Sequence, residues 1–420
     1  LSEEEVDTYI FLIVNELSFA VELLQDQDEK IGFAELCLQA GIKAMKSSDF
    51  KTAVFYFWLG IGLLRKNRSW RDHYSLSLEL YNAVAEAEYC VANFDKMEFA
   101  VQEVLSNATC FTDKVRAYST RVYSLGGRLQ FQEAIDLGLF VLDHLGETFP
   151  SKLRMGMLLT DVCKTTILLR RRSNSQLLNL PNIIDTRKVA AMGILNLLTC
   201  YTFFGKPELF PFVAGRLVRL SLKFGLCAIS AVGFSMYGIV YAGAGDFENG
   251  YRCGQLGVQI SERYGDAGAD FVPRVYSVLY GMTAIWKQHI RSTLDPLLHA
   301  HRVGLETGDI EFSMCGAVMY CINAFGAGVS LPDLEEKMKF YLELMDTYKI
   351  KLFGAVAGLQ LQVVQNLLGK AEDPVVLTGD TMDQEVGLKL ALEMKNSAYL
   401  FLFMTWRLVL AYHFGDLELA

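Results

Sequence analysis

Apolar residues recur along this chain at the three-to-four-residue spacing of amphipathic helices, and the alternating pattern of strands is scarce. The predicted helices follow one another through short turns, such as Ser48-Asp49-Phe50 and Gly245-Asp246-Phe247. Short turns between consecutive helices make them antiparallel neighbours. The pattern therefore predicts an all-α fold made of helix pairs.

Small residues stand at matching places in two of these predicted pairs. Twelve positions separate Gly41 from Ala53, and twelve separate Gly238 from Gly250. In each pair, one small residue lies inside the first helix and the other opens the second helix. Two helices can cross this closely only where both lack bulk, as in a tetratricopeptide hairpin. We therefore expect a tetratricopeptide-like α-solenoid of antiparallel helix pairs, with three further repeat positions at Phe57, Tyr241 and Gly257.

The repeats are degenerate, and one stretch interrupts them. Pro150 breaks the chain, a helix follows, and residues 171–184 form a polar segment that is predicted to be a loop. We expect degenerate N-terminal repeats over residues 1–170 and C-terminal repeats over residues 185–420. The chain begins with Leu1 and ends as another helix opens, so we expect it to be a piece of a larger protein whose last repeat is truncated.

Residues 226–244 carry no charge over nineteen positions, which meets the length of a membrane-spanning helix. Glycines and serines interrupt the run, and its two tyrosines do not form a belt at both ends. The run also ends at a turn that fits the repeat, and an apolar helix is what the middle of a solenoid requires. We therefore expect a buried helix and no membrane insertion.

Composition narrows the function further. Apolar residues make up 52% of the chain and charged residues 21%, which is typical of a packed globular protein. The net charge of -9 and the absence of a basic stripe argue against binding of nucleic acid. The nine cysteines are scattered through apolar stretches without a paired spacing, which favours free thiols in a reducing cytoplasm.

The sequence contains no recognisable arrangement of catalytic, cofactor-binding or metal-binding residues. His299 and His301 are two positions apart, so they point in different directions on a helix. The glycines near residue 243 are not followed by the Gly-Lys-Ser/Thr of a phosphate-binding loop. The one candidate for an interaction is the basic run Arg170, Arg171 and Arg172, although such a run also complements the dipole at a helix C-terminus.

Three groups of segments resemble a known family. They include Asp113-Lys-Val-Arg-Ala-Tyr, Glu133-Ala-Ile-Asp-Leu-Gly-Leu, Leu177-Leu-Asn-Leu-Pro, Pro207-Glu-Leu-Phe-Pro, Trp286-Lys-Gln-His-Ile-Arg and Gly304-Leu-Glu-Thr-Gly-Asp-Ile-Glu. In this order, they resemble the helical-repeat region of very large hybrid sensor kinases. In that family a serine/threonine-kinase-like domain and a STAND/AAA-type ATPase precede the repeats, and a GAF domain and a histidine kinase follow them.

The resemblance implies a non-catalytic scaffold or relay that links an ATPase switch to sensor and kinase domains. Its expected partners are the ATPase, GAF and kinase domains of the same protein, and ATP would bind in those flanking domains. No catalytic motif of the family lies in this segment, so no catalytic residue can be transferred. Three alternatives remain: a free-standing peptide-binding adaptor, an all-α enzyme and an integral membrane protein.

Overall fold

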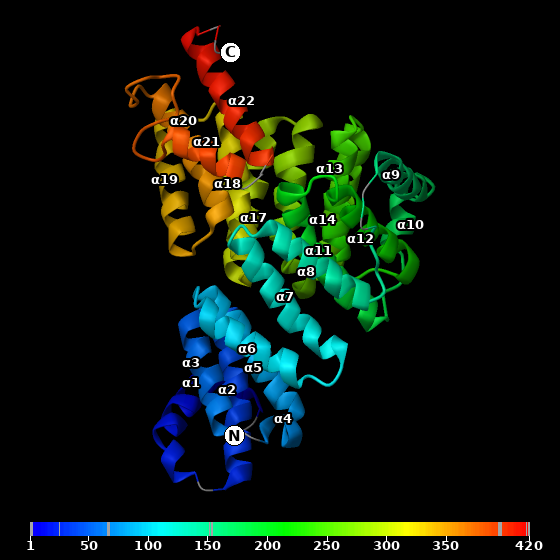
Figure 1. Cartoon of the computed structure of the whole chain (residues 1–420), viewed down its shortest axis with the longest axis vertical. Coiled ribbons are helices and arrows are strands. Elements are labelled where there is room, and N and C mark those ends of the chain that lie inside the picture. The colour runs from blue at the N-terminus through cyan, green and yellow to red at the C-terminus, as the bar shows by residue number, and fades with distance from the viewer. Residues whose placement is uncertain are drawn as a thin grey trace. The chain divides into compact units, whose positions relative to one another are not determined.

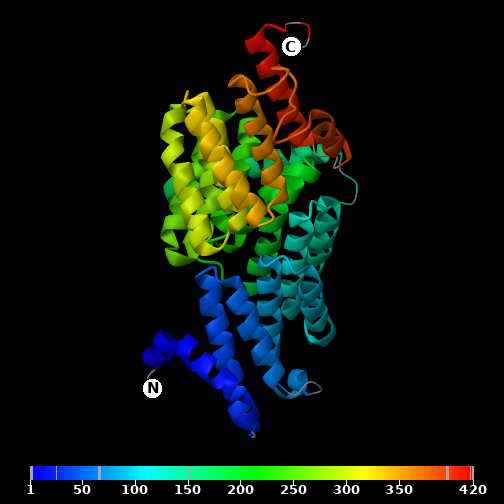
Figure 2. The ribbon, with the colours of Figure 1, turned by 90° about the vertical axis from the view of Figure 1, so that its left-hand side faces the viewer.

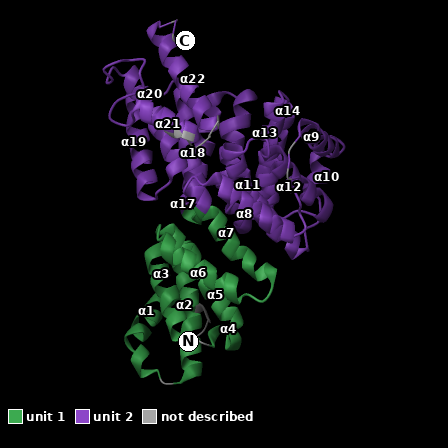
Figure 3. Ribbon diagram, viewed as in Figure 1, with its two compact units in different colours: residues 1–124, 306–308 green, residues 125–305, 309–420 purple. Residues whose placement is uncertain are grey.

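The chain is all-α in a computed structural model that describes residues 3–24, 26–64, 68–150, 152, 154–393, 397–416 and 418. Many helices pack in neighbouring pairs, so the fold is solenoid-like, as the sequence predicts (Figures 1 and 2). The described residues contain no β-strand, and their one isolated β-bridge joins Asn182 to Leu226. Two compact units are distinguished in Figure 3, and each is described by itself.

Unit 1 comprises residues 1–124 and 306–308. Its main pairs are α2 with α3 and α5 with α6, and α3 also packs against α5. The Phe57 ring of α3 fills the space beside Gly41 of α2, where an added Cβ would lie 2.3 Å from the ring. The elements that begin in this unit are α1 (Glu3–Phe19), η1 (Val21–Leu23), α2 (Gln27–Lys46), α3 (Phe50–Leu63), α4 (Ser69–Asp72), α5 (Tyr74–Cys90), α6 (Phe94–Asn107) and α7 (Phe111–Gly127).

Unit 2 comprises residues 125–305 and 309–420. Its first half contains α8 (Phe131–His144), α9 (Met155–Arg170), α10 (Asn174–Leu178), α11 (Thr186–Gly205), α12 (Phe210–Phe224), α13 (Ser230–Gly243), α14 (Phe247–Arg263) and α15 (Asp266–Ala269). Its second half contains α16 (Val272–Val278), η2 (Leu279–Thr283), η3 (Ala284–Trp286), η4 (Ile290–Thr293), α17 (Leu294–Thr307), α18 (Ile310–Gly326), α19 (Leu331–Thr347), α20 (Lys351–Leu367), α21 (Gln384–Glu393) and α22 (Ser397–Phe414).

Helices α13 and α14 cross at close range in this unit. A Cβ added to Gly238 would lie 2.7 Å from the carbonyl oxygen of Gly250, and one added to Gly250 would lie 2.9 Å from that of Gly238. Gly257 lies against Ala231 two turns further along, where an added Cβ would be 2.7 Å from the Ala231 carbonyl oxygen. The buried Tyr241 ring meets the Tyr237 ring edge-on near this crossing. The two backbones are therefore in direct contact.

Helices α9 and α10 form an insertion between two helices that pack together. The Phe131 ring of α8 stacks on the Tyr201 ring of α11 with centroids 6.1 Å apart. A Cβ added to Gly138 of α8 would lie 2.7 Å from the Leu198 side chain of α11. Because α8 packs directly against α11, the segment between them is an insertion between two paired helices. We call residues 147–184 the insertion.

The predicted loop 171–184 lies within this insertion and contains the short helix α10. Ser173 and Gln176 form a capping box at its start. The segment belongs to unit 2, whose boundary with unit 1 falls at Ser124. The predicted division into repeat domains at residues 1–170 and 185–420 is a different division from these compact units. It stays a prediction.

The uncharged run 226–244 contains a helix of 14 residues, α13. At 1.5 Å per residue it is about 21 Å long, shorter than the ~30 Å hydrocarbon core of a bilayer. Among the described residues, α11 alone has the length and apolar composition of a spanning helix, and 56% of its apolar window is buried within the protein.

Candidate interaction surface on the inserted helix

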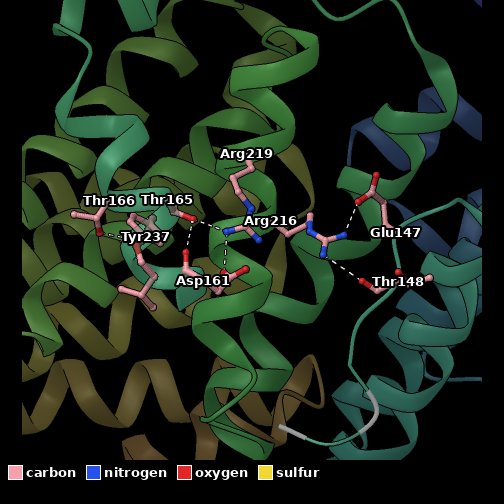
Figure 4. A network of polar contacts seen from close by, with 9 residues as sticks. Glu147, Thr148, Asp161, Thr165, Thr166, Arg216, Arg219 and Tyr237 are labelled. Atoms are coloured by element: carbon pink, nitrogen blue, oxygen red, sulfur yellow. Dashed lines mark hydrogen bonds and ion pairs between the residues drawn. The ribbon is translucent and has the colours of Figure 1, made fainter. Parts of the chain in front are cut away.

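Helix α9 packs against α12 through its polar side. Only Thr165 and Leu169 are buried among its residues. Asp161 of α9 pairs with Arg219 of α12 at 2.8 Å, and the side chains of Asp161 and Arg219 are 19% and 13% exposed. The same guanidinium group of Arg219 also donates to the Thr165 hydroxyl group. The contact between α9 and α12 therefore includes a charge-assisted hydrogen-bond network, which Figure 4 shows.

A tyrosine of α13 extends this network. The hydroxyl group of Tyr237 donates to the Val162 carbonyl oxygen of α9 at 3.0 Å and lies 3.3 Å from the Thr166 hydroxyl group. Burial raises the pKa of Tyr237 to about 12, so the phenol keeps its proton and remains a donor at neutral pH. Tyr237 thus anchors the middle of α9 through a hydrogen bond to a backbone carbonyl oxygen of that helix.

A second cluster fixes the point where the chain leaves α8. Glu147 accepts from Lys188 of α11 and from Arg216 of α12, each at 2.6 Å. Arg216 also donates to the Thr148 carbonyl oxygen at 3.1 Å, and its guanidinium group lies 4.8 Å from the centroid of the Phe149 ring. Burial opposes ionisation of Glu147, but the two cationic donors outweigh it and lower its pKa.

The predicted interaction residues Arg170, Arg171 and Arg172 lie at the end of α9. Arg170 pairs at 2.8 Å with Asp246, which caps α14 by accepting from the Asn249 amide. The Arg172 carbonyl oxygen accepts from Arg252 at 2.6 Å. Two of the three residues therefore fasten the insertion to α14, and the third, Arg171, is exposed. Binding of a partner by this run stays a prediction.

The opposite side of α9 exposes apolar side chains. Met155 is 70% exposed, Leu159 is 59% exposed and Ile167 is 48% exposed, and Cys163 between them is exposed as well. An open hollow of about 560 Å³ lies on this side, and its described lining residues are Leu159, Thr160, Cys163, Lys164, Ile167 and Leu168. We call the side defined by Met155, Leu159, Cys163 and Ile167 the outer face of α9.

Sequence reasoning missed the outer face for a specific reason. Apolar residues occur around much of the circumference of α9, so its periodicity does not show which side is buried. The only available signal was the placement of Asp161 and Thr165 opposite Leu159 and Ile167. That arrangement indicates a polar side, but it does not indicate that the polar side faces inward.

These clusters of polar residues hold helices in position. Asp161 and Glu147 each accept hydrogen bonds from cationic side chains, and the two donors to Glu147 lower its pKa. The pair His299 and His301 also has local partners, because the His301 imidazole bonds to Ser313 and the His299 ring lies beside Tyr276. Within the described ranges, no group of three or more His, Cys, Asp or Glu residues is placed to hold a metal ion.

Comparison with known proteins indicates signalling. No protein-family model matches the chain. The chain is 21% identical over 401 residues to Hybrid signal transduction histidine kinase G of Dictyostelium discoideum. That alignment covers 87% of this chain and 12% of the relative, so the chain spans a small part of the curated protein it matches. The similarity supports a region of a signal-transduction protein, weakly related to a hybrid histidine kinase.

Proposed function

We propose that this chain is a non-catalytic helical scaffold and relay within a multidomain signalling kinase. The observation that carries the proposal is the similarity to a hybrid histidine kinase, which extends over 87% of a chain that folds as stacked helix pairs. In this role the segment links an ATPase switch to sensor and kinase domains of the same protein. It holds no cofactor of its own, and ATP binds in the flanking domains.

The mechanism we propose is mechanical. In a tetratricopeptide-like array each helix pair contacts its neighbours, so small changes in rotation between pairs add along the stack. The direct backbone contact between Gly238 and Gly250 supports rigid coupling within one pair, because no flexible side chain separates the helices. The tetratricopeptide-like register of Gly41, Ala53, Phe57 and the later repeat positions is part of this proposal.

The relay is tested in the parent protein by autophosphorylation with radiolabelled ATP. Deletion of residues 1–420 is expected to change the dependence of phosphorylation on signal. Gly238→Leu, which separates α13 from α14, is expected to change it in the same direction. Gly193→Ala is the matched control, because an added Cβ there meets nothing within 4 Å. Unchanged signal dependence after the deletion would contradict the relay.

The runner-up function is a free-standing adaptor that binds proteins or peptides in the cytoplasm. The exposed outer face of α9 is the observation that favours it. The two functions predict different flanking domains in the full reading frame. A Gly-Lys-Ser/Thr loop upstream and a histidine phosphoacceptor helix downstream support the relay, and their absence from the full reading frame supports the adaptor.

A further inference from the structure

We propose that the outer face of α9 binds an amphipathic helix of a partner protein whose apolar stripe is flanked by carboxylates. Met155, Leu159, Cys163 and Ile167 follow one another at steps of four, so they form one continuous strip along the helix. The strip is about 18 Å long at 1.5 Å per residue, which matches three turns of a docked helix. This inference is independent of the relay, because a scaffold or an adaptor would use the surface in the same way.

The surface is open, and its described lining residues all belong to α9. The hollow of about 560 Å³ lies along Leu159, Cys163 and Ile167. Methionine beside such a hollow adapts its shape to an incoming helix. The recognition mode is therefore a helix that places apolar anchors at spacings of three and four.

The charge of the segment identifies the chemistry of the partner. Residues 152–172 contain one acidic residue, Asp161, which is already paired with Arg219. They contain six basic residues, of which Arg170 is paired with Asp246, although the whole chain has a net charge of -9. The basic residues are Lys152, Arg154, Lys164, Arg170, Arg171 and Arg172. A partner with carboxylates beside its apolar stripe is the electrostatic complement of this segment.

Two other occupants fit less well. A second copy of α9 would bring basic residues against basic residues, because the segment offers no unpaired acidic residue in exchange. A membrane surface favours helices with aromatic anchors, and α9 contains no Phe, Tyr or Trp.

The inner side of α9 gives the surface its rigidity. The Asp161–Arg219 pair, the Tyr237 hydrogen bond and the buried Leu169 hold the helix from behind without using the four residues of its outer face. Those four residues remain available for a partner, and the helix is ordered before binding. Such preorganisation reduces the entropy lost on association.

The test uses the 420-residue chain and two labelled synthetic helical peptides. The first carries leucines at spacings of three and four with flanking glutamates, and the second carries lysines in place of the glutamates. In fluorescence anisotropy the acidic peptide is expected to bind and the basic peptide is not. Binding is expected to weaken at least about tenfold in Leu159→Asp/Ile167→Asp and in Lys164→Glu, which place carboxylates against carboxylates.

The matched control is Phe340→Asp, which alters an apolar residue of similar exposure on α19 of the same unit and should bind like the wild type. Circular dichroism of each variant checks that the helices are retained. Equal affinity for both peptides, or affinity unchanged in Lys164→Glu and in the double variant, would show that the proposal is wrong.

A second measurement needs no substitution. Cys163 lies in the hollow, and Cys110 is exposed in unit 1. The acidic peptide is expected to slow maleimide labelling of Cys163 and to leave Cys110 unaffected, as read by peptide mass spectrometry. Equal protection of both thiols, or of neither, contradicts the proposed site.

Two further assays distinguish the competing occupants. Vesicles of phosphatidylserine and phosphatidylcholine are offered to the wild type and to the double variant, and sedimentation velocity measures self-association. We expect neither vesicle binding nor self-association that depends on Leu159 and Ile167. Vesicle binding without binding of the acidic peptide would overturn the proposal in favour of a membrane. Self-association without binding of the acidic peptide would overturn it in favour of a second copy.

Discussion

At the scale of residues, glycine decides where helices touch. Gly238 and Gly250 bring two backbones so close that a side chain at either position would meet a carbonyl oxygen. Gly193 lies inside α11 without any such neighbour. The same residue type therefore serves close packing in one helix and only weakens the helix in the other.

This difference predicts opposite effects for one chemical change. Gly238→Ala is expected to lower the free energy of unfolding by about 1–3 kcal/mol, because the new methyl group forces α13 and α14 apart. Gly193→Ala is expected to raise it by about 0.5–1 kcal/mol through helix propensity. Urea unfolding followed by circular dichroism measures both changes, and a stabilised Gly238→Ala would contradict the close crossing.

Glu335 gives a second prediction at this scale. Hydrogen bonds from Lys339 and Lys370 lower the pKa of Glu335 from 4.5 to about 2. Because the pKa is lower in the folded state, its stabilisation is complete above about pH 4.5 and is lost as the pH falls toward 2. Since both lysines are half-exposed, Glu335→Gln is expected to cost about 1–2 kcal/mol at pH 6, after discounting for solvent screening.

The difference in unfolding free energy between wild type and Glu335→Gln should shrink as the pH is lowered from 4.5 to 2. The control is Asp346→Asn, which removes an exposed ion pair with Lys349 at 3.6 Å and should have little effect. A difference that stays constant across this pH range would show that the Glu335 carboxylate does not supply the stabilisation.

At the scale of elements, α9 departs from the usual arrangement of an amphipathic helix, although it also buries Leu169. Its polar residues Asp161 and Thr165 face α12, and its apolar residues Leu159 and Ile167 face solvent. A surface helix normally buries its apolar stripe and exposes its polar side. The reversal is possible because Arg219 and Tyr237 satisfy the polar groups that α9 buries.

The prediction at this scale concerns local opening of α9. Asp161→Ala leaves the Arg219 guanidinium group without its carboxylate partner, so opening of α9 is expected to become about 1–2 kcal/mol easier. Hydrogen exchange measured by mass spectrometry should show faster exchange in residues 155–170 and little change in α13 and α14. Lys164→Ala on the outer face is the control, and equal effects of both substitutions would contradict the role of the polar network.

At the scale of the whole molecule, the two compact units predict separable stability. Phe57 is fully buried in unit 1, and Phe234 is fully buried in unit 2. Each truncation to alanine is expected to cost about 3–5 kcal/mol through the lost contacts and the cavity left behind. In stacked helical repeats, stability depends on nearest neighbours, so the loss should remain near the cavity.

Hydrogen exchange tests this separation with a matched pair of variants. Phe57→Ala should speed exchange in α2, α3 and α5 and leave α13 and α14 unchanged. Phe234→Ala should produce the reverse pattern. Equal loss of protection in both units after either substitution would mean that the chain unfolds as one cooperative body.

By itself, the sequence determined that the chain folds into helix pairs, because the spacing of apolar residues and the short turns act over neighbouring residues. Local contacts complete the helix starts, as where Asp185 caps α11 by accepting from the Lys188 amide three residues later. Caps and periodicity depend on local geometry, which a single sequence displays directly.

Only the tertiary structure decided that α8 pairs with α11 and that α9 turns its apolar side outward. Both outcomes depend on residues far apart in the chain, such as Phe131 with Tyr201 and Asp161 with Arg219. A helix that is apolar around much of its circumference offers more than one side for packing. The available partners then select the side, because buried polar groups must find hydrogen bonds and apolar surface can remain exposed at a smaller cost.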